Sequence, residues 1–146
     1  MGYKEEKQHQ LDMRYLRMAR IWAENSYCVR RKVGALIVKD KMIISDGYNG
    51  TPSGFENVCE DAHGVTHPYV LHAEANAIIS ASRRDMVGGT LYLVGRDART
   101  GELLGDATSC SMCRRVIINA GVGIVDVSIQ SFDAASGQLS FTATGQ

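Results

Sequence analysis

Four side chains suit metal binding and acid–base catalysis by their residue types and their positions in the sequence: His72, Glu74, Cys110 and Cys113. His72 and Glu74 form a His-x-Glu pattern, and after a long gap the two cysteines form Cys-x-x-Cys. Imidazole nitrogen and thiolate sulfur are ligands that Zn²⁺ prefers, and a catalytic zinc keeps three protein ligands and leaves one position for water. Glu74 can lie beside the metal without binding it. The set therefore predicts a zinc-activated water that attacks an amidine-like carbon.

Each motif alone has a simpler interpretation. A Cys-x-x-Cys pair could be a structural zinc site or a redox pair, His72 a core histidine and Glu74 a solvated helix residue. A structural zinc would need a fourth protein ligand, and the joint pattern favours a catalytic zinc. We therefore expect His72, Cys110 and Cys113 to hold the metal. Glu74 would take a proton from the water and pass protons to the ring nitrogen and then to the departing ammonia. Acid–base catalysis of this kind typically raises the rate about 10²–10⁴-fold.

Composition and charge limit the function classes. The chain of 146 residues predicts one domain over residues 1–146. Its 16 basic and 16 acidic residues give a net charge of zero, which argues against polymeric nucleic acid and favours a small substrate. No apolar run approaches the roughly 18 residues of a membrane span, and residues 1–10 lack an apolar signal core. We expect a cytoplasmic protein whose cysteines are metal ligands or buried thiols before they are disulfides.

Periodic apolar side chains indicate the elements that position these residues. Helices are expected over residues 8–25, 72–83 and 110–120, the last ended by Gly121 in a left-handed cap. The side chains expected to face inward on the first and last helices are Leu11, Tyr15, Met18, Ala19 and Trp22, and Val116, Ile117 and Ala120.

Shorter apolar runs predict the strands. Residues 35–38 and 42–45 are expected to form an antiparallel hairpin. Further strands are expected over residues 90–94 and 122–129, with an edge strand over 138–144. Residues 47–64 and 95–109 are polar and rich in turn formers, so they are expected to be loops. The order of elements predicts an α/β fold with helices packed on the faces of a mixed sheet.

Longer segments carry a resemblance to a known family. Residues 46–54, Asp-Gly-Tyr-Asn-Gly-Thr-Pro-Ser-Gly, ahead of residues 72–78, His-Ala-Glu-Ala-Asn-Ala-Ile, resemble the deoxycytidylate (dCMP) deaminase branch of the zinc-dependent cytidine deaminase superfamily. Residues 30–39 and 114–121 resemble the same branch, and the likeness covers about residues 11–127. It implies a three-layer α/β/α sandwich around a mixed sheet of about five strands.

The resemblance also implies an activity and partners. The activity is hydrolysis of a cyclic amidine C–N bond, converting dCMP to dUMP and ammonia in pyrimidine deoxynucleotide metabolism, upstream of thymidylate synthesis. The expected cofactor is Zn²⁺. A homo-oligomer is implied, with dCTP and dTTP as effectors, and neither a membrane nor a polymeric nucleic acid is expected as a partner.

By motif position, the resemblance extends the site to the substrate. Asn49 is expected to hydrogen-bond the sugar, and Arg31, with Lys32 behind it, to contact the 5′-phosphate. Tyr48 is expected to bound the pocket or an effector site. The residues expected to line the nucleotide pocket are Thr51, Pro52, Ser53 and Ala73. Two alternatives stay open: residues 30–32 could be a solvated basic turn, and Asn49 could be a turn residue.

The chain departs from the family pattern in two places. Ser109 stands where proline usually precedes the first zinc cysteine, and serine can cap the helix through its hydroxyl. Residues 95–108 are a polar insert, expected near the pocket mouth. The insert could change base or phosphate specificity or carry an effector contact, and its simplest interpretation is a passive surface excursion.

A second, structural zinc is admitted by the resemblance. Its candidate ligands are Cys28, Cys59, His63 and His67, although the histidine spacing does not match the family pattern. Otherwise Cys28 and Cys59 are expected to be buried thiols.

Three other functions compete with dCMP deamination. The first is a deaminase of another free cytidine-type nucleoside or nucleotide, which phosphate dependence would distinguish. The second is a non-catalytic deaminase scaffold kept for assembly. The third is a structural zinc protein with four protein ligands. The intact set of His72, Glu74, Cys110 and Cys113 favours an enzyme, because a scaffold has no physical need for all four.

Overall fold

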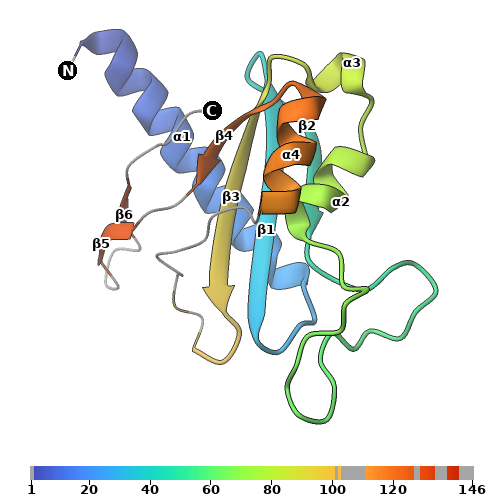
Figure 1. The fold of residues 1–146 in the computed structure, drawn as a ribbon. Helices are drawn as coiled ribbons and strands as arrows, with labels where there is room; N and C mark the ends of the chain where they lie inside the picture. Colours follow the sequence, from blue (N-terminus) through green and yellow to red (C-terminus); the bar gives the residue numbers. More distant parts are fainter. Residues whose placement is uncertain (1, 101, 103–110, 127–128, 134–137, 142–146) are drawn as a thin grey trace.

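A mixed four-stranded sheet forms the centre of the molecule (Figure 1). The computed structural model describes residues 2–100, 102, 111–126, 129–133 and 138–141. The strand order is β2-β1-β3-β4, with β1 antiparallel to β2 and β3, and β3 parallel to β4. The strands are β1 Arg31–Lys39, β2 Met42–Tyr48, β3 Thr90–Asp97 and β4 Gly123–Asp126. The described sheet therefore has one strand fewer than the expected number of about five.

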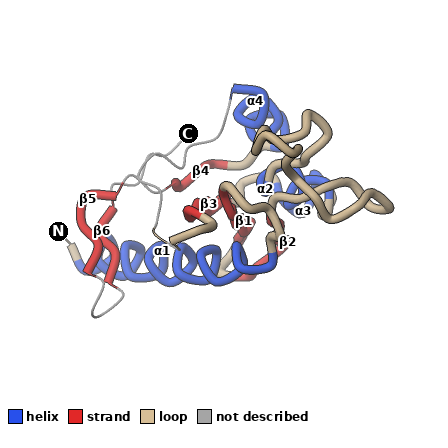
Figure 2. Tube along the Cα trace, turned by 90° about the horizontal axis from the view of Figure 1, so that it is seen from below, coloured by secondary structure: helices blue, strands red, loops and turns tan. Residues whose placement is uncertain are grey.

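Helices cover both faces of this sheet, as Figure 2 shows. The long helix α1, Tyr3–Trp22, runs into the 3₁₀ turn Ala23–Asn25 and packs on one face. The helices on the other face are α2 Ala73–Ile79, α3 Arg83–Met86 and α4 Ser111–Ala120. The expected three-layer α/β/α arrangement is confirmed. Within the described residues, no helix is both long and apolar enough to cross a bilayer.

The β1–β2 hairpin matches its sequence signals. Asp40 and Lys41 both have positive φ, 51° and 63°, which suits the tight turns whose twist matches that of the flanking strands. Successive β1 side chains alternate between the faces, so Leu36 packs in the core under α1 and Ile37 in the core under α2 and α4. Strand β1 is therefore buried on both sides and forms the middle of the sandwich.

The inward faces of two helices differ from the prediction. On α1 the buried residues are Met13, Leu16 and Ala19, whereas Met18 and Trp22 are exposed. These buried residues are three positions apart and form the stripe that lies against the sheet. Trp22 lies outside this stripe, and its indole Nε1 donates to Asp46 Oδ1 at 3.0 Å. The placement of Val116 on the buried face of α4 was also wrong, since it is 40% exposed while Ile117 is buried. The predicted left-handed end of α4 at Gly121 is confirmed, with φ 76°.

A buried polar contact fastens α1 to the sheet. The hydroxyl of Tyr92, on β3, donates to Asp12 Oδ1 at 2.5 Å, and the ring of Tyr15 lies 5.1 Å from that of Tyr92. Burial, together with the Asp12 carboxylate, raises the pKa of Tyr92 far above its usual value. The phenol therefore stays protonated near neutral pH and keeps donating to Asp12.

The C-terminal strands form a separate small sheet. Strand β5, Ile129–Asp133, pairs antiparallel with β6, Gln138–Phe141. Of the predicted strand over 122–129, Gly123–Asp126 form β4 and Ile129 begins β5, while residues 127–128 lie outside the described part. A strand within residues 138–144 is confirmed as far as Phe141, but it pairs with β5 and is not an edge of the main sheet. Residues 142–144 lie outside the described part.

Gly34 allows α1 to approach the sheet. A Cβ at this position would lie 2.7 Å from the backbone nitrogen of Ala23, so a side chain would push the helix away. We expect Gly34→Ala to lower the free energy of unfolding by about 1–3 kcal/mol, measured by urea denaturation. Gly2→Ala is the control, because nothing lies within 4 Å of that site. Equal stability of the two variants would contradict this packing.

Candidate active site

The starts of α2 and α4 bring two predicted metal ligands together. His72 is the N-cap residue of α2, and Cys113 lies in the first turn of α4. The two residues are far apart in sequence, yet His72 Nδ1 lies 3.3 Å from Cys113 Sγ. Cys113 is buried, whereas His72 is exposed at the surface. One imidazole and one thiol thus converge where the sequence predicts a metal.

Glu74 lies at the same point. Its side chain is only 4% exposed, and its carboxylate, His72 and Cys113 offer ligand atoms that all lie within 4.8 Å of one another. Glu74 is in the first turn of α2, where unpaired backbone N–H groups favour a negative charge. A buried acid held beside two metal donors is suited to moving protons.

The described donors fit a zinc ion. Nitrogen and sulfur are the ligand atoms that zinc prefers, and the carboxylate beside them has the position of an acid–base group. Cys110, the third predicted ligand, lies outside the described residues, as does Ser109. Cys110 directly precedes the first residue of α4, Ser111. His72, Cys110 and Cys113 therefore remain the predicted zinc set, with two of the three brought together.

Strand β2 sets the position of α2. At Gly47 a Cβ would lie 2.5 Å from the carbonyl oxygen of Ala73, so only glycine lets the helix lie this close. Two side chains then fasten the contact: Ser45 Oγ donates to the Ala77 carbonyl at 2.6 Å, and Asn76 Nδ2 donates to the Tyr48 carbonyl at 2.8 Å. Ala73, a predicted substrate contact, is fully buried at the start of α2.

The Asn49 amide is bound to strand β1. The backbone N–H of Val33 donates to Asn49 Oδ1, and Asn49 Nδ2 donates to the Arg31 carbonyl, both at 2.9 Å. The backbone N–H of Asn49 donates to the Val33 carbonyl at 3.2 Å. Asn49 therefore continues the pairing of β1 beyond the end of β2. A sugar contact would have to use its remaining lone pair and N–H, and it stays a prediction.

Charged residues gather where β1 begins. Arg31 is exposed and lies opposite Asp97 of β3, while Lys32 lies opposite Arg96. The backbone N–H groups of residues 99 and 100 donate to the Asp97 carboxylate and hold its pKa below the usual value. Arg96 Nη1 lies 3.2 Å from Glu24 Oε1. Strand alternation places Arg31, the predicted phosphate contact, on the face of the sheet that carries α2 and α4. The starts of these two helices bring His72 and Cys113 together.

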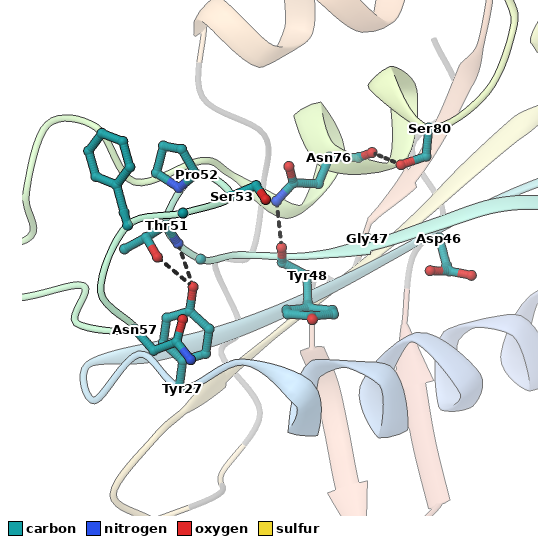
Figure 3. A pocket seen from close by; sticks show the side chains of 13 residues that line it. Tyr27, Asp46, Gly47, Tyr48, Thr51, Pro52, Ser53, Asn57, Asn76 and Ser80 are labelled. Atoms are coloured by element: carbon teal, nitrogen blue, oxygen red, sulfur yellow. Dashed lines mark hydrogen bonds between the residues drawn. The ribbon is translucent and has the colours of Figure 1, made fainter.

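Thr51, Pro52 and Ser53 line a cavity of about 540 Å³ beside α2 (Figure 3). In its wall the Tyr27 hydroxyl accepts from the Thr51 backbone N–H at 2.8 Å and shares a 2.7 Å hydrogen bond with the Thr51 hydroxyl. The remaining lining residues come mainly from β2, α2 and the following loop: Asp46, Gly47, Tyr48, Gly50, Gly54, Phe55, Asn57, Asn76 and Ser80. None of the described metal donors is among them, although Asn76 belongs to the same helix as Glu74.

Cys28 and Cys59 are joined in a disulfide. The expectation that they would be thiols was therefore wrong, because residues of the long β2–α2 loop fold back on residues 26–30 and bring the two Cα atoms to 5.2 Å. The nearby potential ligand is the buried carboxylate of Glu60. Neither His63 nor His67 belongs to this cluster, and the His67 ring stacks instead on Tyr69 at 4.8 Å.

Sequence reasoning missed Tyr27 and Glu60. Both act through contacts with segments more than 20 residues away, Tyr27 with Thr51 and Glu60 with the backbone of Val29 and Arg30. Neither lies in a motif with a fixed spacing. The only local signal was the position of Glu60 directly after Cys59 in a long loop.

The fold and the donors together define a class, an α/β/α protein with a candidate metal centre at the starts of two helices. The family model described as "Cytidine and deoxycytidylate deaminase zinc-binding region" matches residues 9–129. The chain belongs to this cytidine and deoxycytidylate deaminase family.

Individual relatives are similar over most of the chain. The deoxycytidylate deaminase of Mycobacterium phage D29 is 36% identical over 96 residues, covering 56% of this chain and 75% of that protein. The Homo sapiens deoxycytidylate deaminase is 29% identical over 143 residues, covering 90% and 74%. The dCMP deaminase from cyanophage S-TIM5, solved in complex with dCMP and dUMP, has a TM-score of 0.65 and 32% identity, covering 86% of this chain and 82% of that one.

The predicted division of roles can be tested by metal content. We expect Cys113→Ala to lose the zinc of this centre, because a thiolate ligand is removed, while Glu74→Gln keeps it. The zinc-to-chain ratio of the purified variants, measured by atomic emission, checks both. Loss of zinc in Glu74→Gln to the extent seen in Cys113→Ala would make Glu74 a ligand and contradict the assignment.

Proposed function

We propose that this chain catalyses the hydrolytic deamination of dCMP to dUMP and ammonia. The observation that carries the proposal is the convergence of His72 Nδ1, Cys113 Sγ and the buried Glu74 carboxylate within 4.8 Å. It occurs in a chain whose relatives are named deoxycytidylate deaminase, and a similar solved structure holds dCMP and dUMP. The donor set matches the chemistry that this reaction needs.

The chain's own residues supply the proton transfers. A zinc held by His72, Cys110 and Cys113 would lower the pKa of a bound water to about 7. Glu74 accepts a proton from the attacking water and delivers it to the ring nitrogen of cytosine. It then carries the second proton to the exocyclic amine, so the C–N bond breaks as a carbonyl forms and ammonia leaves. Burial of Glu74 keeps its carboxylate aimed at these atoms and not at bulk water.

The substrate end of the site follows from β1 and its neighbours. Arg31 is our candidate for the 5′-phosphate contact, with Lys32 behind it, because an exposed guanidinium can bind phosphate oxygens in a bidentate way. Asn49 remains the candidate for the sugar. Ala73 and the loop residues Thr51, Pro52 and Ser53 remain predicted substrate contacts. A deaminase of another cytidine-type nucleoside would not need the charge at Arg31.

Ammonia release from a panel of substrates tests this proposal. We expect purified enzyme to turn over dCMP faster than deoxycytidine, CMP or dCTP, and Glu74→Gln to lose about 10²-fold or more in kcat while keeping zinc. Equal rates for dCMP and deoxycytidine would refute the nucleotide assignment. Unchanged turnover in Glu74→Gln would refute the proton-transfer role and leave the non-catalytic scaffold as the better interpretation.

The cavity beside α2 is our candidate for the effector nucleotides dCTP and dTTP. Tyr48 supplies an aromatic wall, and Asn76 and Ser80 supply polar side chains, on the side of the cavity away from the predicted substrate contacts Thr51 and Pro52 (Figure 3). Because Asn76 lines the cavity and Glu74 lies two residues earlier on α2, a ligand there would contact the catalytic helix.

Tyr48→Ala tests the effector site. We expect this variant to lose most of the response of the deamination rate to added dCTP and dTTP, with a smaller effect on dCMP turnover in their absence, since the Tyr48 carbonyl still binds Asn76. The rate with and without effectors is the measurement. Val65→Ala, at an exposed site on the same loop that is not part of the cavity wall, is the control. A full response in Tyr48→Ala would move the effector site elsewhere.

The finer points of metal content, assembly and location belong to the same proposal. A second zinc at Cys28 and Cys59 requires reduced sulfurs, with Glu60 as the nearest further donor. The zinc-to-chain ratio of the reduced protein tests whether this zinc binds.

A homo-oligomer is supported by exposed apolar side chains on α4, and sedimentation would measure its size. A cytoplasmic location is also proposed.

A further inference from the structure

Glu60 is a buried carboxylate whose oxygens are occupied by backbone. Its side chain is 8% exposed. The backbone N–H of Val29 donates to Oε1 at 3.1 Å and to Oε2 at 3.2 Å, and the N–H of Arg30 donates to Oε1 at 3.2 Å. No salt bridge links Glu60 to a cationic side chain in the part of the chain that the structure describes. Burying an acid is costly unless it is hydrogen-bonded, so this carboxylate is committed to residues 29 and 30.

The backbone around Glu60 is itself held in place. The preceding residue, Cys59, is joined to Cys28, and its carbonyl accepts from the His67 N–H at 2.7 Å. Glu60 also forms a bridge with Thr66. The carboxylate therefore projects from a fixed point of the loop toward the segment that leads into β1.

The residues that Glu60 holds run directly into the basic start of β1. The Arg30 carbonyl accepts from the Ala98 N–H at 3.1 Å, and the Arg31 carbonyl accepts from Asn49 Nδ2 at 2.9 Å. The backbone of this segment is thus fixed on three sides, while the side chains of Arg30 and Arg31 are exposed. A merely solvated basic turn would not require a buried acid and an amide to fix its main chain.

We propose that Glu60 is a positioning residue for phosphate recognition by Arg31. It fixes the main chain from which the guanidinium extends, and this reduces the ordering cost of binding an anion. Because its oxygens accept from backbone N–H groups, Glu60 does so without neutralising the arginines. This inference rests on the proposed function, in which Arg31 contacts the 5′-phosphate of dCMP.

Kinetics with and without a substrate phosphate test the inference. For Glu60→Ala we expect the KM for dCMP to rise about five- to tenfold with kcat nearly unchanged, and the KM for deoxycytidine to stay constant. Glu60→Gln is the rescue variant, because a carbonyl oxygen in place of Oε1 can accept from both N–H groups, and its kinetics should return to nearly those of the wild type. Glu56→Ala, exposed on the same loop, is the matched control.

A double variant separates this inference from the function on which it rests. If Glu60 acts through Arg31, Glu60→Ala should add little to the KM effect of Arg31→Ala. A rise in KM for Arg31→Ala without one for Glu60→Ala overturns the positioning role and leaves the phosphate contact intact. Unchanged dCMP kinetics in Arg31→Ala overturns the phosphate contact itself.

Two outcomes would show a different role for Glu60. Equal losses of kcat/KM for dCMP and deoxycytidine would make its role structural. A zinc-to-chain ratio that falls in Glu60→Ala would make it a metal ligand. If Glu60→Ala fails to fold, Glu60→Asp replaces it, since the shorter acid cannot reach both N–H groups. For Glu60→Asp we then expect the KM for dCMP to rise while the KM for deoxycytidine stays constant. The absence of this difference overturns the proposal.

Discussion

The 3.3 Å distance between His72 Nδ1 and Cys113 Sγ sets the geometric requirement that the fold has to meet. It joins the starts of two helices that lie far apart in the chain. Both helices must lie on the same face of the sheet, and each must begin at the same end. The parallel connection from β3 through α4 to β4 meets this requirement for Cys113. The close packing of α2 on Gly47 meets it for His72.

The convergence of His72, Glu74 and Cys113 and the fold class could be predicted because their signals are local. The spacing of two positions between His72 and Glu74, and of three between Cys110 and Cys113, is read directly from the sequence and does not depend on tertiary packing. The β1–β2 hairpin follows from two apolar runs around a short polar turn, and α4 ends at Gly121 as glycine allows. These features depend on a few neighbouring residues, so a single sequence carries them.

Other features required contacts between distant segments. On α1, three-residue spacing and four-residue spacing each give an apolar stripe, and only the sheet beneath selects Leu16 over Met18. The pairing of Cys28 with Cys59 depends on the return path of a loop without periodicity. The contact of Asn49 with β1 is of the same kind, since an Asn-Gly pair predicts a turn but does not reveal what its amide binds.

Helix α2 presents different chemistry on its two sides. Glu74 faces the metal donors, while Asn76 and Ser80 line the neighbouring cavity, and all three belong to one element of about two turns, Ala73–Ile79 with its C-cap. So short a helix cannot bend between Glu74 and Asn76. A molecule that moves the α2 backbone at Asn76 would also move the backbone from which Glu74 extends, because the two residues are two positions apart in one short helix. A ligand in this cavity would then change proton transfer by Glu74 without contacting Glu74 itself.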